Sequence, residues 1–369
     1  MTTPRHSSAT EYDIAIAGGG PAGAACATLC AAAGLRTLLL EKARFPRDKV
    51  CGDCVNPGCL PVLEQLGVLP EILAAPHFTL SSVTIRGANG HGISLPLPHS
   101  AGPGEIGITR RLLDDILLRR AAAAGAEIHQ ETPIQSLCRE PGGAWRIQTP
   151  LRQFTTRRLI AADGRNSTIA RLLGAAPAAR RDRIGLQAHL PAPPDLEQGI
   201  QLHILADGYC GIAPVGAGLA NFCMVATAGR IDALKSAISS RFGISPSQSW
   251  RSIAPLARAP IGPLRDGVLY IGDAARVVEP FTGEGIYYAL HTATVAARHL
   301  IAGTVPQYPA AHSALYRRRL WINGLARAAV THPRAGALLL RLLSSHPAPI
   351  RYLVGRVNSP SPTIAIPTP

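Results

Sequence analysis

Aromatic residues and lysines are both scarce in this sequence. Phe, Trp and Tyr together make up 5% of the 369 residues, and lysine occurs only at Lys42, Lys49 and Lys235. Proteins that bind single-stranded nucleic acid stack the bases on aromatic side chains, and the chain contains no recognisable nucleic-acid-binding module. The sequence therefore argues against a nucleic-acid partner, although the chain is strongly basic.

Acidic residues are absent from the last quarter of the chain. No Asp or Glu follows Glu284, whereas nine arginines lie between Arg298 and Arg356. These nine account for most of the formal net charge of +14. One interpretation is a solvated helical face. The other is contact with an anionic partner: the inner face of a membrane, a diphosphate or carboxylate substrate, or an acidic carrier protein.

The sequence shows no signal peptide, no membrane span and no metal-binding set. The uncharged stretch Ile14–Leu35 follows Glu11 and Asp13, where a signal peptide would be basic. The eight cysteines are scattered, and no second pair or nearby histidine completes a zinc set around Cys51-x-x-Cys54. We expect a cytoplasmic protein with free thiols and no metal ion. Contact of its basic end with the inner face of the membrane would make it peripheral to that membrane.

What the sequence does contain is a strand–turn–helix–strand pattern over residues 12–42. An apolar run leads to three glycines at G-x-G-x-x-G spacing, Gly18, Gly20 and Gly23, and a second apolar run ends at Glu41. The glycines allow a tight turn, a close backbone approach to a pyrophosphate and close helix packing. The helix offers its N-terminal N–H groups to the phosphates, and the carboxylate of Glu41 suits the ribose hydroxyls. The pattern predicts a dinucleotide site.

The rest of the chain alternates between strand and helix patterns. We expect a β-hairpin over Phe78–Leu97, a helix over Thr109–Ala124 and a strand over Ala126–Leu137. A segment rich in strands spans 184–228, and a long helix begins near Glu284. A chain of this length that is 47% hydrophobic can hold two domains and bury a sizeable core.

Three separated motifs together resemble one family. They are the glycine turn with Glu41, the segment A-D-G-x-x-S-x-x-x-R at Ala162–Arg171, and the segment IGDAARVVEPFTGEGIYYAL at Ile271–Leu290. With FPRDKVCGD and R-x-x-L-D-x-x-L, they resemble the FAD-containing aromatic-hydroxylase superfamily (p-hydroxybenzoate hydroxylase type), and within it the geranylgeranyl reductase-like oxidoreductases. The similarity covers residues 11–305, and the remaining segment carries no motif that we can match.

The resemblance implies an α/β fold. We expect a Rossmann-like FAD-binding domain of the glutathione-reductase type, with an inserted, mainly antiparallel β-sheet substrate domain and a C-terminal helical tail. The FAD-binding domain is expected at 11–76, 106–180 and 263–305. The substrate domain is expected at 77–105 and 181–262, and the basic helical tail at 306–369.

The resemblance also implies which residues hold FAD. Asp273 would bind the ribityl hydroxyls, or else cap the next helix. The helix that begins near Gly283 would place N–H groups at the flavin pyrimidine ring and stabilise the reduced, anionic flavin. Arg110 would reach the phosphates or the ribityl chain, and the alternative is an arginine on the surface. Asp163 would support the flavin, and the alternative is a purely structural role in the turn. The complete expected set is Gly18, Gly20, Ala22, Gly23, Glu41, Lys42, Cys51, Gly52, Arg110, Ile134, Asp163, Asp273, Gly283, Gly285 and Ile286.

The loop Cys51-Gly52-Asp53 resembles the C-G-x-G loop of the reductase family, which lies beside the flavin ring. Cys51 is therefore a candidate catalytic residue, as a proton donor or as part of the cavity floor, and an inert thiol is the alternative. Cys54 stands where the family has its second glycine. The resulting C-x-x-C would also permit a redox disulfide next to the flavin.

The segment Asp207–Pro214 resembles the G-Y-x-W-x-F-P strand that lines the substrate cavity in this family. Tyr209 matches and is the second candidate catalytic residue, as a hydrogen-bond donor or stacking partner, with a purely structural aromatic as the alternative. Gly211 and Ala213 replace the bulky Trp and Phe. We therefore expect a wider cavity, which puts the family's usual prenyl substrate in question.

The sequence leaves three main functions open, and a subunit that binds flavin without turnover in a biosynthetic assembly is a weaker fourth. The leading one is an FAD-dependent oxidoreductase that transfers hydride to a C=C bond of an apolar, anionic or carrier-bound isoprenoid, lipid or secondary metabolite. The second is an NAD(P)H-dependent flavin monooxygenase or halogenase, although the halogenase signature W-x-W-x-I-P is absent. The third is a FixC-like flavin electron carrier to a membrane quinone. Only one glycine fingerprint occurs, so NAD(P)H is expected to act as a transient reductant.

Overall fold

A parallel β-sheet forms the first layer of the molecule. The computed structural model describes residues 11–87, 91–98, 103–180, 183–194, 196, 199–317 and 319–359. The parallel strands are, in spatial order, β20 (Val268–Tyr270), β11 (Gln153–Ala161), β1 (Glu11–Ala17), β2 (Thr37–Leu40) and β8 (Glu127–His129). Antiparallel strands extend this sheet: β19 (Leu264–Arg265), β10 (Trp145–Gln148) and β9 (Ser136–Arg139). Parallel strands are covered on both faces, which explains the continuous apolar runs of β1 and β2.

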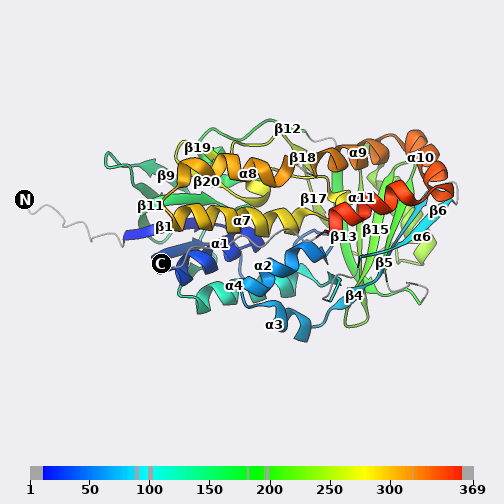
Figure 1. Ribbon diagram of the computed structural model, residues 1–369, viewed down its shortest axis with the longest axis horizontal. Helices are drawn as coiled ribbons and strands as arrows, with labels where there is room; N and C mark the ends of the chain where they lie inside the picture. Colours follow the sequence, from blue (N-terminus) through cyan, green and yellow to red (C-terminus); the bar gives the residue numbers. More distant parts are fainter. Residues whose placement is uncertain are drawn as a thin grey trace, which may run out of the picture.

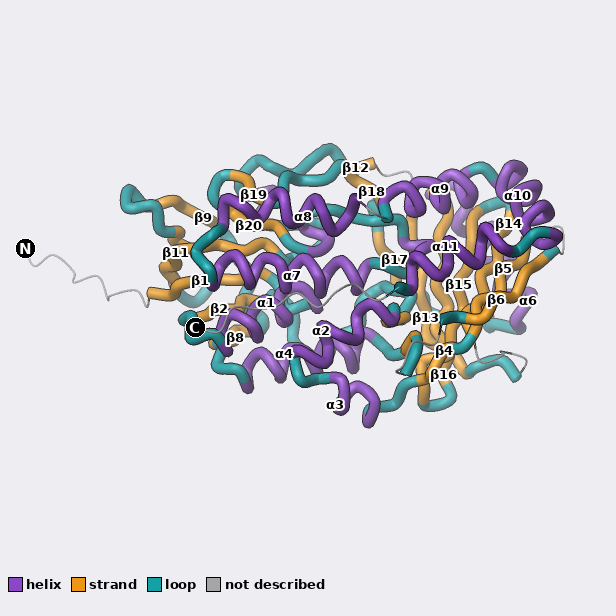
Figure 2. The backbone as a smooth tube through the Cα atoms, in the orientation of Figure 1, coloured by secondary structure: helices purple, strands orange, loops and turns teal. Residues whose placement is uncertain are grey.

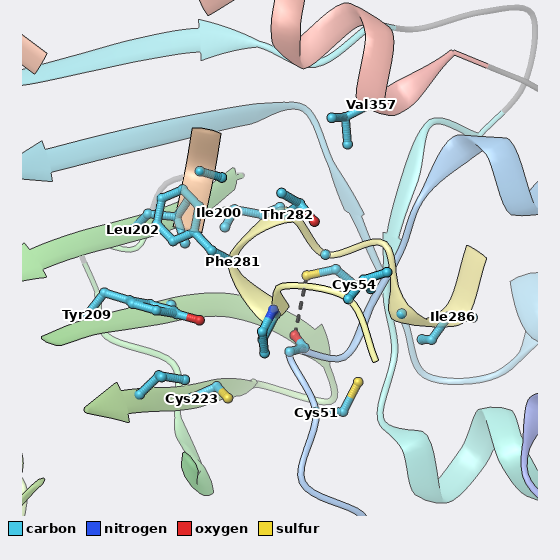
Figure 3. Close-up of a pocket in the computed structure, with 18 of the residues that line it drawn as sticks. Cys51, Cys54, Ile200, Leu202, Tyr209, Cys223, Phe281, Thr282, Ile286 and Val357 are labelled. Carbon is cyan, nitrogen blue, oxygen red and sulfur yellow. Dashed lines mark hydrogen bonds between the residues drawn. The ribbon is translucent and has the colours of Figure 1, made fainter. Parts of the chain in front are cut away.

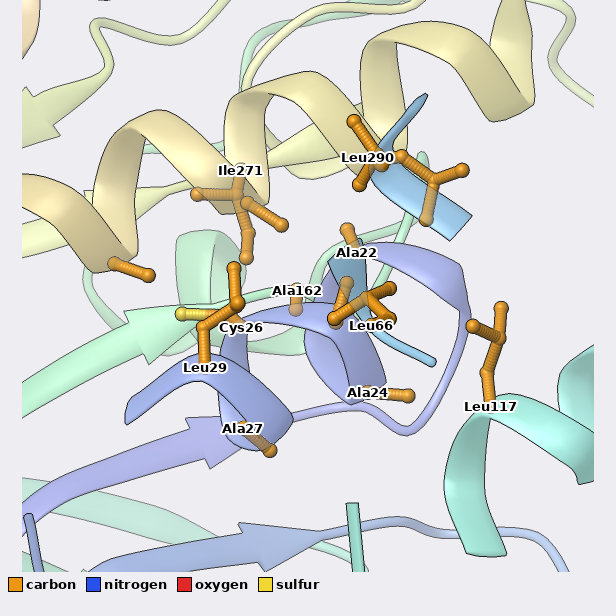
Figure 4. Packing of buried hydrophobic residues seen from close by; sticks show 14 of the residues in the cluster. Ala22, Ala24, Cys26, Ala27, Leu29, Leu66, Leu117, Ala162, Ile271 and Leu290 are labelled. Atoms are coloured by element: carbon orange, nitrogen blue, oxygen red, sulfur yellow. The ribbon is translucent and has the colours of Figure 1, made fainter. Parts of the chain in front are cut away.

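Helix α1 (Pro21–Ala32) packs against the sheet between α4 (Arg110–Ala123) and α7 (Gly285–Ile301). Almost every residue of α1 is buried, and its composition of small residues allows close approach. A Cβ atom placed on Gly272, just after β20, would lie 3.0 Å from the Cβ of Ala22. Figure 4 shows the same contact region, where Cys26 and Leu29 of α1 meet Ile271.

A second, seven-stranded sheet lies beside the first. Its strands are, in spatial order, β17 (Arg251–Ile253), β13 (Arg183–Pro191), β16 (Leu219–Thr227), β15 (Gly208–Gly216), β14 (Gly199–Leu205), β5 (Ser82–Gly87) and β6 (Gly92–Pro96). All neighbours are antiparallel except β14 and β5. A small sheet joins the two layers: β3 (Cys54–Val55), β7 (Glu105–Gly107) and β4 (Phe78–Leu80).

Four helices, α8 to α11, stand last in the part of the chain that the structure describes. Helix α8 (Tyr308–Arg317) packs against α7, and α9 (Leu320–Thr331), α10 (Pro333–Ser345) and α11 (Ala348–Asn358) follow. Figures 1 and 2 show these last three helices lying over the second sheet, where α9 contacts β15 and α10 contacts β6. Leu340 and Ile350 join the apolar cluster of that sheet. We call α9, α10 and α11 the roof helices.

The remaining elements are short connections. Helix α6 (Ile231–Phe242) packs against β15 and β16. The others are α2 (Leu60–Gln65), α3 (Leu69–Ala74), α5 (Thr168–Leu172), the strand pair β12 (Ala179–Arg180) and β18 (Ala257–Arg258), and the single turns η1 (Pro57–Cys59), η2 (Ala228–Arg230), η3 (Gly272–Ala274), η4 (Pro280–Thr282) and η5 (Val305–Gln307). Among the residues described, no helix combines the length and apolar character needed to cross a membrane.

The predicted fold class is confirmed: a Rossmann-like layer, a mainly antiparallel second sheet and a helical end. The single strand expected over Ala126–Leu137 is wrong. The segment forms two short strands, β8 and β9, because Glu131 adopts a left-handed backbone conformation with φ of 54° and ends the pairing. Pro133 follows it and cannot donate a backbone hydrogen bond.

Candidate active site

One long cavity of about 370 Å³ runs from the glycine turn after β1 to the space beneath the roof helices. Its lining comes from the N-termini of α1 and α7, the 49–54 loop, the second sheet and all three roof helices. Figure 3 shows Tyr209 and Cys223 on strands of the second sheet, Phe281 and Thr282 on the η4 turn, and Val357 on α11, all around this space. The two domains and the helical end therefore build one site.

The glycine turn at one end of the cavity is tightly packed. Gly18 has φ of +103°, and a Cβ atom placed there would lie 2.7 Å from the carbonyl oxygen of Ala162. A Cβ atom on Gly23 would lie 1.9 Å from the carbonyl oxygen of Gly18. Gly20 caps α1 without any side-chain hydrogen bond. The first N–H groups of α1 therefore face the cavity without a side-chain acceptor.

Several predicted site residues lie outside the cavity lining. Glu41 is 5% exposed, and its carboxylate accepts hydrogen bonds from the backbone N–H groups of Gly19 (2.7 Å) and Ala43 (2.8 Å). Lys42 is exposed, and Ile134 packs half-buried against the core of the first sheet. Gly18, Gly23 and Asp163 are also absent from the lining, although Ala162 and Gly164 contribute to it.

Asp163 stabilises the turn after β11. Its Oδ2 accepts a hydrogen bond from the N–H of Ile169 (3.0 Å) near the start of α5, and its buried Oδ1 has no hydrogen-bond partner among the described residues. Burial raises the pKa of Asp163. The next charged residue, Arg165, lines the cavity, and its Nη2 lies 3.7 Å from the Oδ2 of Asp273.

Cationic side chains gather at the end of the cavity nearest the glycine turn. Arg110 makes a bidentate ion pair with Asp114, with distances of 2.6 and 2.7 Å, and both are buried. Arg47 lies 3.3 Å from the same carboxylate. Lys49 also lines the cavity, and burial together with the nearby charge of Arg110 lowers its pKa to about 8. This end of the cavity therefore suits an anionic group.

The N-terminus of α7 enters the middle of the cavity. Gly283, with φ of +69°, Gly285 and Ile286 all line it, and Cβ atoms on the two glycines would meet no heavy atom within 4 Å. Between them, Glu284 is fully buried and turns away toward the roof helices. Its carboxylate contacts Arg319 (3.4 Å) and Asn323 (2.9 Å).

The loop that carries Cys51 is fixed from the second sheet. The backbone carbonyl of Cys51 accepts hydrogen bonds from Gln187 and Asn221, both at 3.0 Å. Asp53 is fully buried with φ of 57°, and its Oδ2 lies 2.6 Å from the Nε2 of His189. These contacts hold the loop so that Cys51 lines the cavity, as Arg110 also does.

Cys51 and Cys54 are both free thiols in this structure. The Cys54 thiol donates a hydrogen bond to the carbonyl oxygen of Gly52 at 3.3 Å (Figure 3). Burial raises the pKa of Cys54 well above its ordinary value, which disfavours the thiolate that disulfide exchange requires.

Tyr209 is held by polar partners rather than directed freely into the cavity. Its hydroxyl donates to the Oε1 of Glu279 at 3.4 Å, and Glu279 makes a bidentate ion pair with Arg183 at 3.0 and 2.8 Å. The ring lies edge-on to Phe281, with centroids 5.1 Å apart. Burial raises the pKa of Tyr209, so its hydroxyl stays protonated.

Residues 11–216 match a family model described as an FAD binding domain, which is more than half of the chain. The chain belongs to this family. It is also similar to the menaquinone reductase of Mycolicibacterium smegmatis, with 28% identity covering 82% of this chain and 79% of that protein. The digeranylgeranylglycerophospholipid reductase of Methanosphaerula palustris is 30% identical over 78% of this chain and 76% of its own length.

The fold of this FAD-binding protein recurs among solved structures. The flavin-dependent brominase Bmp2 superposes with a TM-score of 0.76 and 20% identity, covering 95% of this chain and 94% of that one. At this identity the likeness shows the fold alone. The family and its reductase relatives establish that the chain is an FAD-dependent oxidoreductase and confirm the resemblance seen in the motifs.

The residues of the cavity fit FAD. The close packing at Gly18 and Gly23 leaves no room for side chains and creates the turn that a pyrophosphate requires. Two helix N-termini, those of α1 and α7, reach the cavity with no side-chain cap. Among the described residues, Arg165 has buried Nε and Nη1 donors without hydrogen-bond partners. Ten predicted site residues share this one cavity: Gly20, Ala22, Cys51, Gly52, Arg110, Tyr209, Asp273, Gly283, Gly285 and Ile286.

Sequence reasoning missed several residues of the cavity. Lys49 and Asp53 stand on either side of the Cys51-Gly52 motif, and their charge in a loop near a nucleotide site was the available signal. Glu105 gave no signal, because it belongs to no motif. The sequences of the roof helices gave no signal either, because their apolar positions are as consistent with a buried core as with a cavity lining.

Proposed function

We propose that this protein reduces a C=C bond of an isoprenoid or similar apolar lipid. The observation that carries the proposal is the apolar length of the cavity beyond the flavin site. There the lining is aliphatic and comes from both the second sheet and the roof helices, including Val83, Ile85, Leu202, Leu340 and Val354. Burying a flexible hydrocarbon chain against such a surface is favoured by the hydrophobic effect.

The two reductase relatives support this substrate class. One is named for menaquinone and the other for digeranylgeranylglycerophospholipid, and both substrates carry polyprenyl chains. Gly211 and Ala213 line the cavity where bulkier residues would narrow it. A wider channel accommodates a branched prenyl chain, so the small residues are compatible with this substrate.

When bound and reduced, FAD supplies a hydride equivalent to the substrate. The chain itself positions the substrate, excludes water and provides a proton. The roof helices and the second sheet cover the alkene from solvent. The Cys51 thiol lies in the lining and is held in place through its own backbone carbonyl. We assign it the proton that the second alkene carbon needs.

We also propose NAD(P)H as the reductant, bound only transiently. The supporting observation is that the described chain contains one Rossmann-like layer, and its glycine turn belongs to the FAD site. To test this, the holoprotein is mixed with NADPH or with NADH, and reduction of the flavin is measured as loss of its absorbance. Failure of both, with rapid reduction by dithionite, would point to a separate electron donor.

The test of the function uses the reduced holoprotein without oxygen. Geranylgeraniol is added, and flavin reoxidation is followed by absorbance. The proposal predicts substrate-dependent reoxidation under anaerobic conditions. Reoxidation that requires O₂ and is accelerated by the substrate would instead indicate a monooxygenase or halogenase. Anaerobic reoxidation by a soluble quinone, with none by the alkene, would indicate an electron carrier.

The roof helices support a further proposal, contact with an anionic membrane surface. They expose Trp321 (51%), Leu342 (59%) and Tyr352 (59%) together with Arg341 and Arg351. No acidic residue follows Glu284 to oppose these charges. A lipid substrate would then enter the cavity from the surface on which the protein rests.

Vesicle flotation tests this contact. The holoprotein should bind vesicles that contain phosphatidylglycerol and should bind phosphatidylcholine vesicles much less. The double variant R341E/R351E should lose the binding, whereas R171E/R241E, which reverses two exposed charges elsewhere, should retain it. Equal flotation of both variants would contradict the proposal.

A further inference from the structure

Glu105 is the one carboxylate of the cavity lining whose side chain has no hydrogen-bond or ion-pair partner among the described residues. The other carboxylates of the lining are partnered: Asp53 contacts His189 at 2.6 Å, and Asp273 lies 3.7 Å from Arg165. Glu105 is 5% exposed, and no hydrogen bond or ion pair of its side chain occurs within the described part of the chain. A buried carboxylate without a partner is costly, so its retention calls for a ligand.

The strand geometry directs Glu105 toward the substrate end of the cavity. Side chains alternate along β7, and Ile106 packs into the core of the first sheet. Glu105 therefore lies on the same face as Gly107, where a Cβ atom would meet the carbonyl oxygen of Pro214 on β15 at 2.1 Å. That face looks toward the second sheet. The strand neighbour of Glu105 is Leu80, which belongs to the apolar cluster beneath the roof helices.

Burial, rather than an opposite charge, determines the protonation of Glu105. It raises the pKa of this carboxyl group to about 7. The thiols of Cys54 and Cys59 lie near Glu105, and burial is the main cause that raises the pKa of both. These thiols remain neutral at physiological pH and cannot compensate its charge. The cavity thus has a cationic end, and Glu105 is a carboxylate of its lining without a partner among the described residues.

We propose that Glu105 binds a hydrogen-bond-donating group, an amine or a hydroxyl, on an otherwise apolar substrate. This inference rests on the proposed function, because it treats the apolar part of the cavity as the substrate site. A donor on the substrate supplies the missing partner of the carboxylate through a charge-assisted hydrogen bond. A phosphate or carboxylate group at the same position would be repelled. The substrate keeps the apolar chain of the proposed function, and its polar group is a hydrogen-bond donor rather than an anion.

The test compares three probes that differ only in their polar group: octylamine, octanol and octanoate. Their binding to the oxidised holoprotein is measured by calorimetry at pH 8, so no turnover is needed. We expect octylammonium to bind at least about tenfold more tightly than octanoate, with octanol between them. The preference should shrink at pH 6, where Glu105 is largely protonated before ligand binding.

Two variants locate the preference at Glu105. Both E105Q and E105L should bind the three probes with similar affinities. The control E64Q removes an exposed carboxylate from α2 and should retain the wild-type preference. FAD content and thermal unfolding show whether each variant is folded. If E105Q does not fold, E105L alone provides the comparison.

The outcomes separate this inference from the proposed function. Equal affinities for all three probes in the wild-type protein, or an undiminished preference in both Glu105 variants, would overturn the assignment of Glu105. Geranylgeraniol reduction would be unaffected by that result, and the proposed function would stand. Failure of all three probes to bind would contradict both, because the apolar part of the cavity would then not accept an alkyl chain.

Discussion

At the scale of single residues, the cavity is defined by which polar groups have partners. Asp114 satisfies Arg110, Glu279 satisfies Arg183, and the backbone carbonyl of Cys51 receives two amide donors. Such satisfied groups fix geometry, because each would be costly to leave unpaired. The polar groups without a partner, above all Glu105, are the positions at which the protein can bind a ligand.

The unpartnered carboxylate makes a prediction about stability. The folded-state pKa of Glu105, about 7, is raised above the unfolded value of 4.5. Folding therefore favours the protonated form, and the stability this provides is present below pH 4.5 and lost as pH rises toward 7. Relative to wild type, E105Q should gain about 3 kcal/mol in unfolding free energy between pH 4.5 and pH 8. Urea unfolding at several pH values measures this, and a pH-independent difference would contradict it.

Cys51 makes a prediction about catalysis. If its thiol supplies the proton, C51A should lower the anaerobic rate of alkene reduction by a factor of about 100 while retaining FAD. Stopped-flow absorbance of the flavin measures the rate. The control C138A removes an exposed thiol on β9 and should leave the rate unchanged. A normal rate in C51A would reduce Cys51 to part of the cavity floor.

At the scale of elements, the roof helices are tied to the flavin site by buried polar contacts. Arg319, just before α9, reaches Glu284 at the start of α7 and donates to the carbonyl oxygens of Val357 (3.0 Å) and Ser359 (2.7 Å) at the end of α11. Asn56 also donates to the carbonyl oxygen of Val357 at 3.0 Å. These contacts connect the roof helices to the N-terminus of α7.

Removal of the ion pair between Arg319 and Glu284 should weaken the packing of the roof helices. R319M leaves Glu284 buried without its counter-charge and should lower the unfolding free energy by about 3–5 kcal/mol. Thermal unfolding and limited proteolysis of α11 measure the effect. The double variant R319M/E284Q should recover part of the loss, since no unpaired charge remains. R351M, an exposed arginine on α11, is the control, and an equal effect of R351M and R319M would contradict this account.

The sequence predicted local elements well and long-range placement less well. The βαβ unit with its glycines follows from local chemistry, because Gly18 and Gly23 are needed for contacts within that unit and with the neighbouring Ala162. The Cys51 loop was recognised by its motif. Its anchors, Gln187 and His189, lie more than 130 residues away on β13, and no local pattern links them to the loop.

At the scale of the whole molecule, three parts of the chain enclose one cavity. The first sheet and its helices hold the nucleotide, the second sheet provides one wall of the substrate space, and the roof helices cover it. The C-terminal helices could not be placed from the sequence, because their small and aliphatic residues form no recognisable motif. Their arginines suggested an external partner, whereas Arg319 proves to be buried and structural.

The central claim is that an apolar substrate in this cavity is reduced at a C=C bond. The most direct measurement is the mass of geranylgeraniol after a single anaerobic turnover with reduced holoprotein. The account predicts a product that has gained two hydrogen atoms and no oxygen. A product that appears only in air and has gained an oxygen atom would contradict it.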